Sequence, residues 1–573
     1  MAPPSRQLSR GGGGVRQGWI LGAVWVVSYV LVAFLRVATT GARGEEAAGR
    51  SAMSSDQQND APGSYFVGRP TNPGDKTEEP HARGDQNPAT AQTPGAVPAS
   101  PEVELRNRSR TASCSPAKGT QRIFLNLSFN RLRGTVPASL GNLQNLHYLW
   151  LDGNLLEGTI PAALANCSAL LHLSLQGNSL RGIVSYAVAA IPTLQIHSVS
   201  RNQLTGTIPA AAFGGQGNSS LRIVQLGRNE FSQVDVPGGL AADLRVVDLG
   251  GNKLAGPFPT WIAGAGGLTL LDLSGNVFTG ELPPAVGQLT TLLELRLGGN
   301  AFTAAVPAEI GRCSALQVLD LEDNHFTDEV PSALGGLPRL RERHCPYTGT
   351  DSLVAFSSDV PKGFNLFGNS FTRSIPATYG YLPSLQVLSA AHNHISGELP
   401  AELANCSNLA VLELSGNQLT GSILRDLSRL GELEELDLSY NQLSGKIPPE
   451  ISKCSSLTLL KLDDNHFGGD ILASIASLSK LQTLDLSFNN LTGSIPASLA
   501  QIPVLLSFNV SHNELSGEIP AMLGSRFGSS SAYASNSDLC GPPSESECGV
   551  LNVKLWLDRV NQPVLVALIG LSP

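Results

Sequence analysis

Asparagine residues recur along most of this chain at a nearly constant interval of 24 residues, and the positions around them follow one pattern. Apolar residues stand five and three positions before nearly every asparagine and two positions after each one. Glycine usually stands four positions after the asparagine, and proline seven. Sixteen asparagines between Asn130 and Asn513 have this pattern, and the unit around Asn276 is complete, with Leu268, Leu271, Leu273, Phe278, Gly280 and Pro283. A period of roughly 20–50 residues indicates a solenoid of stacked units.

The apolar residues before each asparagine predict a short strand, because Leu271 and Leu273 alternate and so place one face inward. Strands of successive units would stack in parallel, about 4.8 Å apart. An inward asparagine such as Asn276 can satisfy backbone groups where the chain bends out of the strand. Glycine then permits a tight return, and proline cannot donate to a further hydrogen-bond ladder. We therefore expect one elongated solenoid built around a parallel sheet.

The unit LxxLxLxxNxFxGxxP is the signature of leucine-rich repeats, and units such as 441–451 and 489–496 are similar to the NxLxGxIPxxL form of plant extracellular repeats. From about residue 120 to 548 the chain resembles the ectodomains of plant leucine-rich-repeat receptor-like kinases and receptor-like proteins. The resemblance implies an α/β-type leucine-rich-repeat solenoid, with a curved parallel β-sheet on the concave face and helices or 3-10 turns on the convex side. It also implies a plasma-membrane protein that binds a peptide or protein ligand and recruits a co-receptor kinase ectodomain.

The N-terminal segment predicts entry into the secretory pathway. Residues 1–17 contain arginines and no acid, and residues 18–35 are uncharged and mostly apolar. This arrangement is typical of a signal peptide, and the apolar run is also long enough for an uncleaved anchor. The excess of arginine before the run places the repeats outside the cytosol in either case, at the plasma membrane or, after cleavage, secreted or in the cell wall. The expected organisation is a signal peptide or signal-anchor at 1–42, a disordered low-complexity linker at 43–118, a solenoid of about 16–17 repeats at 119–525, a C-terminal cap at 526–548 and a short tail at 549–573.

The chain departs from the family pattern in two places. Only Cys114 precedes the first repeat, whereas the family's N-terminal cap has a cysteine pair, so we expect that cap to be missing or truncated. The interval from Asn324 to Asn369 is nearly two units, and we interpret the stretch 339–362 as one degraded repeat. It could be an island loop used for ligand binding or a join in an imperfect gene model. At the other end, residues 538–548 resemble the family's C-terminal cap, which implies a disulfide between Cys540 and Cys548.

The sequence lacks the motifs that catalysis would need. No glycine-rich loop followed by Val-Ala-x-Lys, no His-Arg-Asp and no Asp-Phe-Gly occur, so we expect no kinase activity from this chain. The net charge of -9 gives no electrostatic reason for nucleic-acid binding. Cys167, Cys313, Cys406 and Cys454 occupy one repeat position, which predicts buried core residues rather than a metal site. We expect a binding protein with no catalytic residues, metal ions or cofactors.

Seven Asn-x-Ser/Thr sequons are candidate glycosylation sites in a secreted chain: Asn107, Asn126, Asn166, Asn218, Asn405, Asn490 and Asn509. None lies between Asn218 and Asn405. A ligand surface has to stay clear of bulky sugar, so this distribution favours the middle third of the arc for binding. The alternative is that Asn-Leu-Ser and Asn-Cys-Ser are simply common ways of filling this repeat.

Side chains that point out of the concave face should stand six, four and two positions before each asparagine. Aromatic and arginine side chains dominate the binding energy of interfaces, so Tyr148, Trp150 and Arg296 are the strongest candidates for ligand contacts. The full set of candidate residues is Tyr148, Trp150, Asp152, His172, Glu294, Arg296, Asp320, Glu322, Glu435, Asp437 and Lys461, and the strip continues with Glu413, Asp463 and Asp485. Many acids four positions before the asparagine belong to the repeat consensus, and their charge would then serve only solubility.

The leading hypothesis is extracellular recognition of a peptide or elicitor by a receptor-like protein that signals through a partner kinase. One alternative is a secreted, wall-associated scaffold or glycosidase inhibitor of the polygalacturonase-inhibitor kind. Another is a truncated receptor-kinase gene product without a function of its own. The number of repeats favours a receptor over an inhibitor, because inhibitors of that kind are shorter. Membrane association through residues 18–35 would support the receptor, and free secretion would support the scaffold.

Overall fold

The computed structural model describes residues 123–214, 220–337, 363–544 and 546–548, all within one compact unit that spans Lys118–Pro573. The expected signal or anchor, linker and tail lie outside the described residues. The same holds for Asn107, Cys114, Asn218 and the stretch 339–362. Within the described residues, no helix combines the length and the apolar character needed to cross a membrane.

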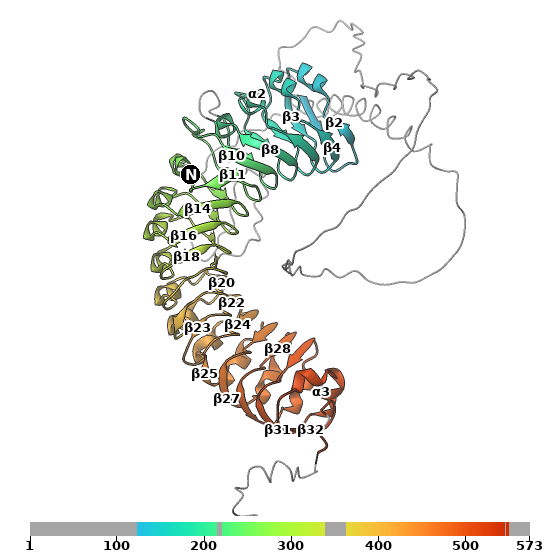
Figure 1. Ribbon diagram of the computed structural model, residues 1–573, viewed down its shortest axis with the longest axis vertical. Coiled ribbons are helices and arrows are strands. Elements are labelled where there is room, and N and C mark those ends of the chain that lie inside the picture. Colours follow the sequence, from blue (N-terminus) through green and yellow to red (C-terminus); the bar gives the residue numbers. More distant parts are fainter. Residues whose placement is uncertain (1–122, 215–219, 338–362, 545, 549–573) are drawn as a thin grey trace, which may run out of the picture. The chain divides into compact units, whose positions relative to one another are not determined.

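Sixteen parallel strands form one sheet, in chain order, along the concave inner side of the solenoid (Figure 1). The residues five and three positions before each asparagine point inward, and Leu271 and Leu273 are fully buried. Neighbouring strands pair in register, as Leu271 does with Leu295. The predicted leucine-rich-repeat solenoid with a curved parallel sheet is confirmed. The strands of this main sheet are β1 (Ile123–Asn126), β3 (Leu146–Trp150), β5 (His172–Ser174), β7 (Ile196–Ser198), β9 (Ile223–Gln225), β11 (Val246–Asp248), β13 (Leu270–Asp272), β15 (Glu294–Arg296), β17 (Val318–Asp320), β19 (Gly363–Asn365), β20 (Val387–Ser389), β22 (Val411–Glu413), β24 (Glu435–Asp437), β26 (Leu459–Lys461), β28 (Thr483–Asp485) and β30 (Ser507–Asn509).

The asparagine side chains form a ladder that ties each repeat to the preceding one. The Nδ2 group of Asn441 donates to the carbonyl oxygens of Leu438 and Ser439 in its own repeat and of Leu414 in the repeat before. Its Oδ1 accepts a hydrogen bond of 3.0 Å from the backbone N–H of Leu419. Asn441 is buried, so these bonds satisfy backbone groups that would otherwise be unpaired in the core. The asparagine therefore has the hydrogen-bonding role that the sequence predicts.

The bend out of each main-sheet strand is made by the residue before the asparagine, and not by the asparagine as the sequence suggested. This residue is left-handed, as in Phe129 (φ 56°), Tyr440 (φ 53°) and Phe488 (φ 52°), or is a glycine such as Gly275 (φ 59°). Left-handed backbone costs a residue with a Cβ roughly 1–2 kcal/mol. The asparagine stabilises the bend by donating to the carbonyl groups of the two residues before the bend, as Asn441 does to Leu438 and Ser439.

A second strand follows the bend in most repeats, and these side strands form smaller parallel sheets that the sequence analysis did not predict. The apolar residue two positions after the asparagine is buried between repeats. Phe278, Phe302, Phe326 and Phe371 stack in succession with ring centroids 6.1–6.3 Å apart. The side strands are β2 (Arg133–Thr135), β4 (Leu155–Gly158), β6 (Ser179–Gly182), β8 (Gln203–Ile208), β10 (Glu230–Val234), β12 (Ala255–Gly256), β14 (Val277–Glu281), β16 (Ala301–Ala305), β18 (His325–Thr327), β21 (Ser396–Gly397), β23 (Gln418–Leu419), β25 (Ser444–Lys446), β27 (His466–Asp470), β29 (Asn490–Gly493), β31 (Glu514–Glu518) and β32 (Asp538–Cys540).

Short 3-10 helices occupy the convex side, as expected, and the proline seven positions after the asparagine usually precedes them. Pro307, for example, caps η6 with an extended backbone at φ -65°. These helices are η1 (Ala138–Asn142), η2 (Ala162–Asn166), η3 (Ala210–Phe213), η4 (Thr260–Gly264), η5 (Pro284–Gln288), η6 (Ala308–Arg312), η7 (Ser332–Gly336), η9 (Ala377–Tyr381), η10 (Ala401–Asn405), η11 (Arg425–Arg429), η12 (Pro449–Lys453), η13 (Ala473–Ser477), η14 (Ala497–Gln501) and η15 (Ser530–Tyr533), with two short α-helices, α2 (Tyr186–Ala189) and α3 (Ala521–Arg526).

The four cysteines at one repeat position are core residues. Cys167, Cys313, Cys406 and Cys454 are fully buried directly after a 3-10 helix. Each Sγ lies 3.3–3.5 Å from a backbone carbonyl oxygen of the preceding repeat. Burial raises the pKa of the Cys313 thiol to about 11, so the thiol stays protonated.

The main sheet is continuous across the long interval from Asn324 to Asn369. β17 pairs directly with β19, with Leu319 opposite Phe364. The Oδ1 atom of Asn369 accepts from the backbone N–H of Phe326 at 3.0 Å, as a ladder asparagine does with the repeat before it. The number of residues between two asparagines therefore does not give the number of main-sheet strands between them. Among the described strands, β17 and β19 are direct neighbours in the sheet.

The C-terminal segment continues the ladder for one more step before the solenoid ends. The Nδ2 group of Asn536 donates to the carbonyl oxygens of Val510, Tyr533 and Ala534, in the pattern of the ladder asparagines from Asn154 to Asn513. β32 then pairs in parallel with β31. The segment expected to form the C-terminal cap thus contains one further ladder asparagine, which the sequence pattern did not reveal because the apolar and glycine positions around Asn536 are irregular.

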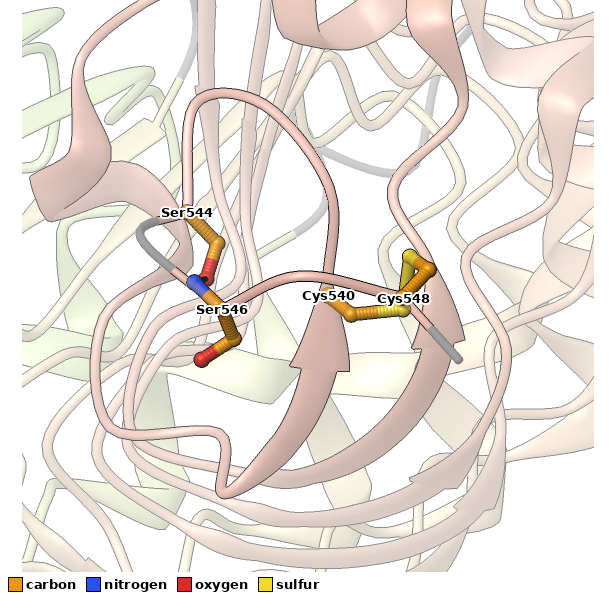
Figure 2. The surroundings of a disulfide bond; sticks show 4 residues. All are labelled: Cys540, Ser544, Ser546 and Cys548. Carbon is orange, nitrogen blue, oxygen red and sulfur yellow. Dashed lines mark hydrogen bonds between the residues drawn. A yellow bond between two sulfur atoms is a disulfide. The ribbon is translucent and has the colours of Figure 1, made fainter. Parts of the chain in front are cut away.

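A disulfide between Cys540 and Cys548 closes the last loop of the described chain (Figure 2). Their Cα atoms are 5.0 Å apart, within the range that an unstrained bridge requires. Inside the loop, the backbone N–H of Ser546 donates to Oγ of Ser544 at 3.2 Å. The pair is the one that the family resemblance implied.

Candidate ligand-binding face

The outward positions of the main sheet form three rows that run from strand to strand across the concave face. Register pairing sets Asp248, Asp272, Arg296 and Asp320 side by side on four successive strands. The candidate residues fall into three groups. We call them the aromatic group (Phe124, Tyr148, Trp150 and His172), the central charged group (Asp248, Asp272, Glu294, Arg296, Asp320 and Glu322) and the acidic group (Glu435, Asp437, Lys461, Asp463 and Asp485).

The aromatic group is a set of rings packed across the first three strands of the main sheet. The rings of Phe124 and Tyr148 stack at 4.5 Å, and Tyr148 meets His172 edge to face at the same centroid distance. Trp150 lies 5.4 Å from Tyr148 and 6.1 Å from His172. His172 is only 3 % exposed and its Nδ1 has no hydrogen-bond partner, while burial lowers its pKa. The group therefore presents a partly exposed apolar surface with one unused polar atom.

Two residues next to the aromatic group differ from the sequence interpretation. Asp152 is a structural brace, because its carboxylate accepts hydrogen bonds from the hydroxyl groups of Ser128 and Ser174 and from the backbone N–H of Gln176. Phe124 was missed, although it stands six positions before the first ladder asparagine and is 47 % exposed. Applying the same offsets to the first repeat would have found it.

The central charged group alternates acids and one arginine. The guanidinium of Arg296 pairs with Glu294 on its own strand at 2.8 Å and is one third exposed. Burial is the main cause that raises the pKa of both Asp248 and Asp320 to about 6, and the neighbouring Asp272 adds to the effect on Asp248. Asp248 and Asp272 were not among the predicted residues, although they occupy the same row. The predicted Glu322 accepts a hydrogen bond of 2.7 Å from Asn365.

Acids four positions before the asparagine have a structural role that sequence reasoning did not assign. One carboxylate oxygen accepts the backbone N–H two residues later, as in Asp272 to Ser274 and Asp437 to Ser439, at 2.9–3.0 Å. Where glycine stands at that later position, the carboxylate of the next strand packs against the glycine. At Gly250 the Asp272 carboxylate lies so close that a Cβ would come within 2.7 Å of Asp272 Oδ1. These acids therefore fix the strand end, and only their second oxygen remains for a ligand.

The acidic group lies near the C-terminal end of the main sheet. Asp437, Lys461 and Asp485 are register neighbours on β24, β26 and β28. Lys461 Nζ lies 3.6 Å from Asp437 Oδ2. Burial and nearby acids, Glu413 first among them, raise the pKa of Glu435. The group therefore has a surplus of negative charge that its single lysine does not balance.

The sequons on described residues lie mostly away from the concave floor. Asn166 and Asn405 end the convex helices η2 and η10, and Asn490 begins the side strand β29. Asn126 and Asn509 lie on β1 and β30, which are the first and last strands of the main sheet. Sequon spacing alone favoured only the middle third as free of sugar. The described outward positions between these two end strands contain no sequon asparagine.

A groove of about 440 Å³ lies outside the concave face, at the break between the side sheets that end at β10 and begin at β12. Val234, Leu254, Pro257, Trp261 and Phe278 are among its lining residues. Sequence reasoning missed it because the break follows from irregular repeat lengths on both sides of Asn229.

Sequence comparison identifies the repeats. The family model described as Leucine rich repeat matches residues 383–443, and a second model with the same description matches residues 123–143, 145–167, 267–289, 315–337 and 480–502. A stretch of 60 residues is 78 % identical to a protein of Oryza sativa subsp. japonica named probable inactive leucine-rich repeat receptor kinase XIAO. That match covers 10 % of this chain and 5 % of the rice protein.

Solved structures extend the similarity to about three quarters of the chain. One similar structure is the leucine-rich-repeat ectodomain of the membrane receptor kinase GASSHO1/SCHENGEN3 from Arabidopsis thaliana, in complex with CASPARIAN STRIP INTEGRITY FACTOR 2. It is 28 % identical to this chain, with a TM-score of 0.59, and the match covers 74 % of this chain and 54 % of that chain. The Arabidopsis receptor kinase HAESA, solved with the peptide hormone IDA and the co-receptor SERK1, is 29 % identical with a TM-score of 0.59, over 74 % of this chain and 71 % of that chain. The chain thus spans about half of the first of these ectodomains. The described repeats are leucine-rich repeats, and their solenoid is similar to the ectodomains of plant receptor kinases.

Proposed function

We propose that the concave face binds a peptide or protein ligand outside the cell, and that a partner kinase, engaged through a co-receptor kinase ectodomain, passes the signal on. In this proposal the chain acts by binding and not by catalysis. It works at the plasma membrane through residues 18–35, or in the cell wall if that segment is cleaved. The wall-associated scaffold or inhibitor and the truncated gene product remain the alternatives to be tested against it.

The aromatic group is the observation that supports this proposal most strongly. Phe124 is 47 % exposed and the rings beside it are only partly covered, on a face where serine and aspartate otherwise dominate. Exposed aromatic side chains that gather in one place mark interaction surfaces. The absence of sequons from the described floor between β1 and β30 supports the same face. The similar ectodomains were solved with a peptide hormone or another named factor bound.

A selection experiment tests the proposal while the ligand is still unidentified. A library of random twelve-residue peptides on phage is selected against the full chain. Enriched peptides are then measured against a Tyr148→Ala/Trp150→Ala variant. Tyr186→Ala is the matched control, because Tyr186 is an exposed aromatic on the convex helix α2.

The expected result is a loss of at least about tenfold in affinity for the concave variant, because truncating aromatic contact residues typically costs more than 1 kcal/mol each. The convex control should bind within about twofold of the unmodified chain. Enriched peptides that bind both variants equally, or no enrichment over an unrelated protein, would reject the concave face as the ligand surface.

A further inference from the structure

Asp463 is a buried carboxylate with an unused oxygen at the edge of the acidic group. The residue is 9 % exposed, and its Oδ1 has no hydrogen-bond partner. A buried charged oxygen without a partner loses its hydration and gains nothing in return. Such an atom in a native protein calls for an explanation, and on a candidate binding face the simplest is a missing ligand group.

The repeat sequence explains why the protein itself does not fill this position. In the neighbouring repeats a serine two positions before the asparagine donates to the aspartate two positions earlier, and Ser439 and Ser487 each do so at 2.6 Å, to Asp437 and Asp485. Both flanking hydroxyl groups are therefore already used. In the repeat of Asp463 the order is changed, with lysine at the first position and aspartate at the second.

The one nearby cation is directed elsewhere. Lys461 Nζ approaches Asp437 at 3.6 Å, so the repeat's own lysine serves the preceding strand. The charged groups that act on Asp463 are Asp437 from β24, Lys461 from β26 and Asp485 from β28, and the phenol of Tyr440 lies at the adjacent bend. These neighbours supply one positive charge and two further carboxylates beside Asp463. The site therefore favours a second cation.

We propose that the Asp463 carboxylate receives the cationic head group of an arginine or lysine side chain from a peptide ligand that lies along the concave face. This inference rests on the proposed function and names one feature of its ligand. A guanidinium or ammonium group would supply the missing donor and balance part of the negative charge, and such charge-assisted hydrogen bonds are the strong ones. The exposed ring of Tyr440, at the bend beside the group, adds a π face that also favours a cation.

The protonation of Asp463 provides a specific signature. Burial, then the charges of Asp485 and Asp437, raise its pKa to about 7. A cation at the carboxylate favours the ionised form, so binding near pH 6.5 should release a proton. Affinity should therefore rise as the pH increases from 6 to 8. A residue that only held the fold would show no such proton release.

The test uses two single-residue probes and the full chain. N-acetylarginine methylamide is titrated by calorimetry at pH 6.5 in buffers of different ionisation enthalpy. N-acetylcitrulline methylamide is the neutral probe of the same shape. Asp463→Asn keeps the shape of the side chain and removes its charge. Asp464→Asn removes the same charge from the exposed next residue and is the matched control.

We expect the arginine probe to bind at least about tenfold more tightly than the citrulline probe, with proton release, as the strength of one charge-assisted bond implies. Asp463→Asn should abolish both the preference and the proton release, and Asp464→Asn should leave both within about twofold. Equal binding of the two probes, or equal effects of the two substitutions, would overturn the inference, as would no binding of either probe. Because the peptide selection depends on the distant aromatic group, that experiment can succeed when this one fails.

Discussion

The side-chain amide of Asn369 donates a hydrogen bond of 2.8 Å to the carbonyl oxygen of Leu321, which lies 48 residues earlier in the chain. In the other repeats this bond spans about one period, as it does between Asn393 and Leu366, 27 residues apart. The long interval before Asn369 therefore leaves the ladder unbroken. The concave face runs on from β17 to β19 as a single sheet.

This continuity predicts that a ladder mutation directly after the long interval costs as much as one in the next repeat. Asn369→Ala should reduce the free energy of unfolding by about 3 kcal/mol, because it leaves several buried backbone groups unpaired. Asn393→Ala removes the same set of bonds and should cost as much. Urea denaturation of both variants provides the comparison. A cost at Asn369 below about 1 kcal/mol, beside a full cost at Asn393, would mean that the ladder is interrupted there.

The turn four positions after the asparagine predicts a stabilising substitution. Ala304 occupies this position with φ 63°, where twelve repeats have glycine. Ala304→Gly should raise the free energy of unfolding by about 1 kcal/mol, since the left-handed strain disappears. Gly280→Ala is the reverse change at φ 79°, with open space around the new Cβ, and should cost about the same. Thermal or urea unfolding that moves both variants in one direction would show that backbone strain does not control this turn.

His197 predicts loss of stability in acid. It occupies an inward position of β7, between Leu173 and Val224, where other repeats have an apolar residue, and neither ring nitrogen has a partner. Complete burial lowers the pKa of its imidazole to about 4, from an ordinary value of 6.5. The unfolded chain then binds the proton more tightly, so stability is unaffected above pH 6.5 and falls as the pH drops, by about 3 kcal/mol near pH 4.

His197→Leu should remove this part of the pH dependence and stabilise the protein at every pH. His147→Leu is a control at a partly exposed position on β3. Melting temperatures between pH 4 and pH 7 measure the effect. Parallel pH profiles for the unmodified chain and His197→Leu would contradict the assignment.

The neighbours Asn126 and Trp150 predict competition between sugar and ligand. They are opposite each other on β1 and β3, and Asn126 Oδ1 accepts the backbone N–H of Ser128 in its own sequon. A glycan on Asn126 would cover Trp150. For the test, the protein is secreted from plant cells and exposed to hydroxyl radicals. Asn126→Gln should increase the oxidation of Trp150 severalfold, and Asn405→Gln on the convex side should leave that oxidation unchanged. Equal oxidation in all three proteins would show that no glycan lies over the aromatic group.

Repetition made most of the fold predictable. Leu271 and Leu273 could be placed in the core, and Asn276 in the ladder, because the same offsets recur sixteen times. The side strands were missed because one apolar residue with glycine two positions later is too short a pattern to indicate a strand. Asn536 and His197 were missed because each departs from the repeat in which it lies, and only the packed neighbours reveal its role.

For the candidate binding face, the sequence predicted which residues point outward but not which of them are already hydrogen-bonded. Offsets placed Tyr148, Trp150 and His172 on one face, and the structure brings their rings together. Hydrogen bonding could not be read from offsets, so Asp152 was taken for a contact residue although its carboxylate is occupied. Asp463 was one acid among several until its unpartnered oxygen distinguished it.

The most direct test of the central claim, that the concave face of the main sheet is the ligand surface, is hydrogen exchange of the full chain with and without a selected peptide. Binding on the concave face should slow exchange in segments from β3 to β28 and leave the convex helices η1 to η14 unchanged. Protection limited to the convex helices, or to the side strands around Trp261, would contradict this claim and place the ligand on another surface.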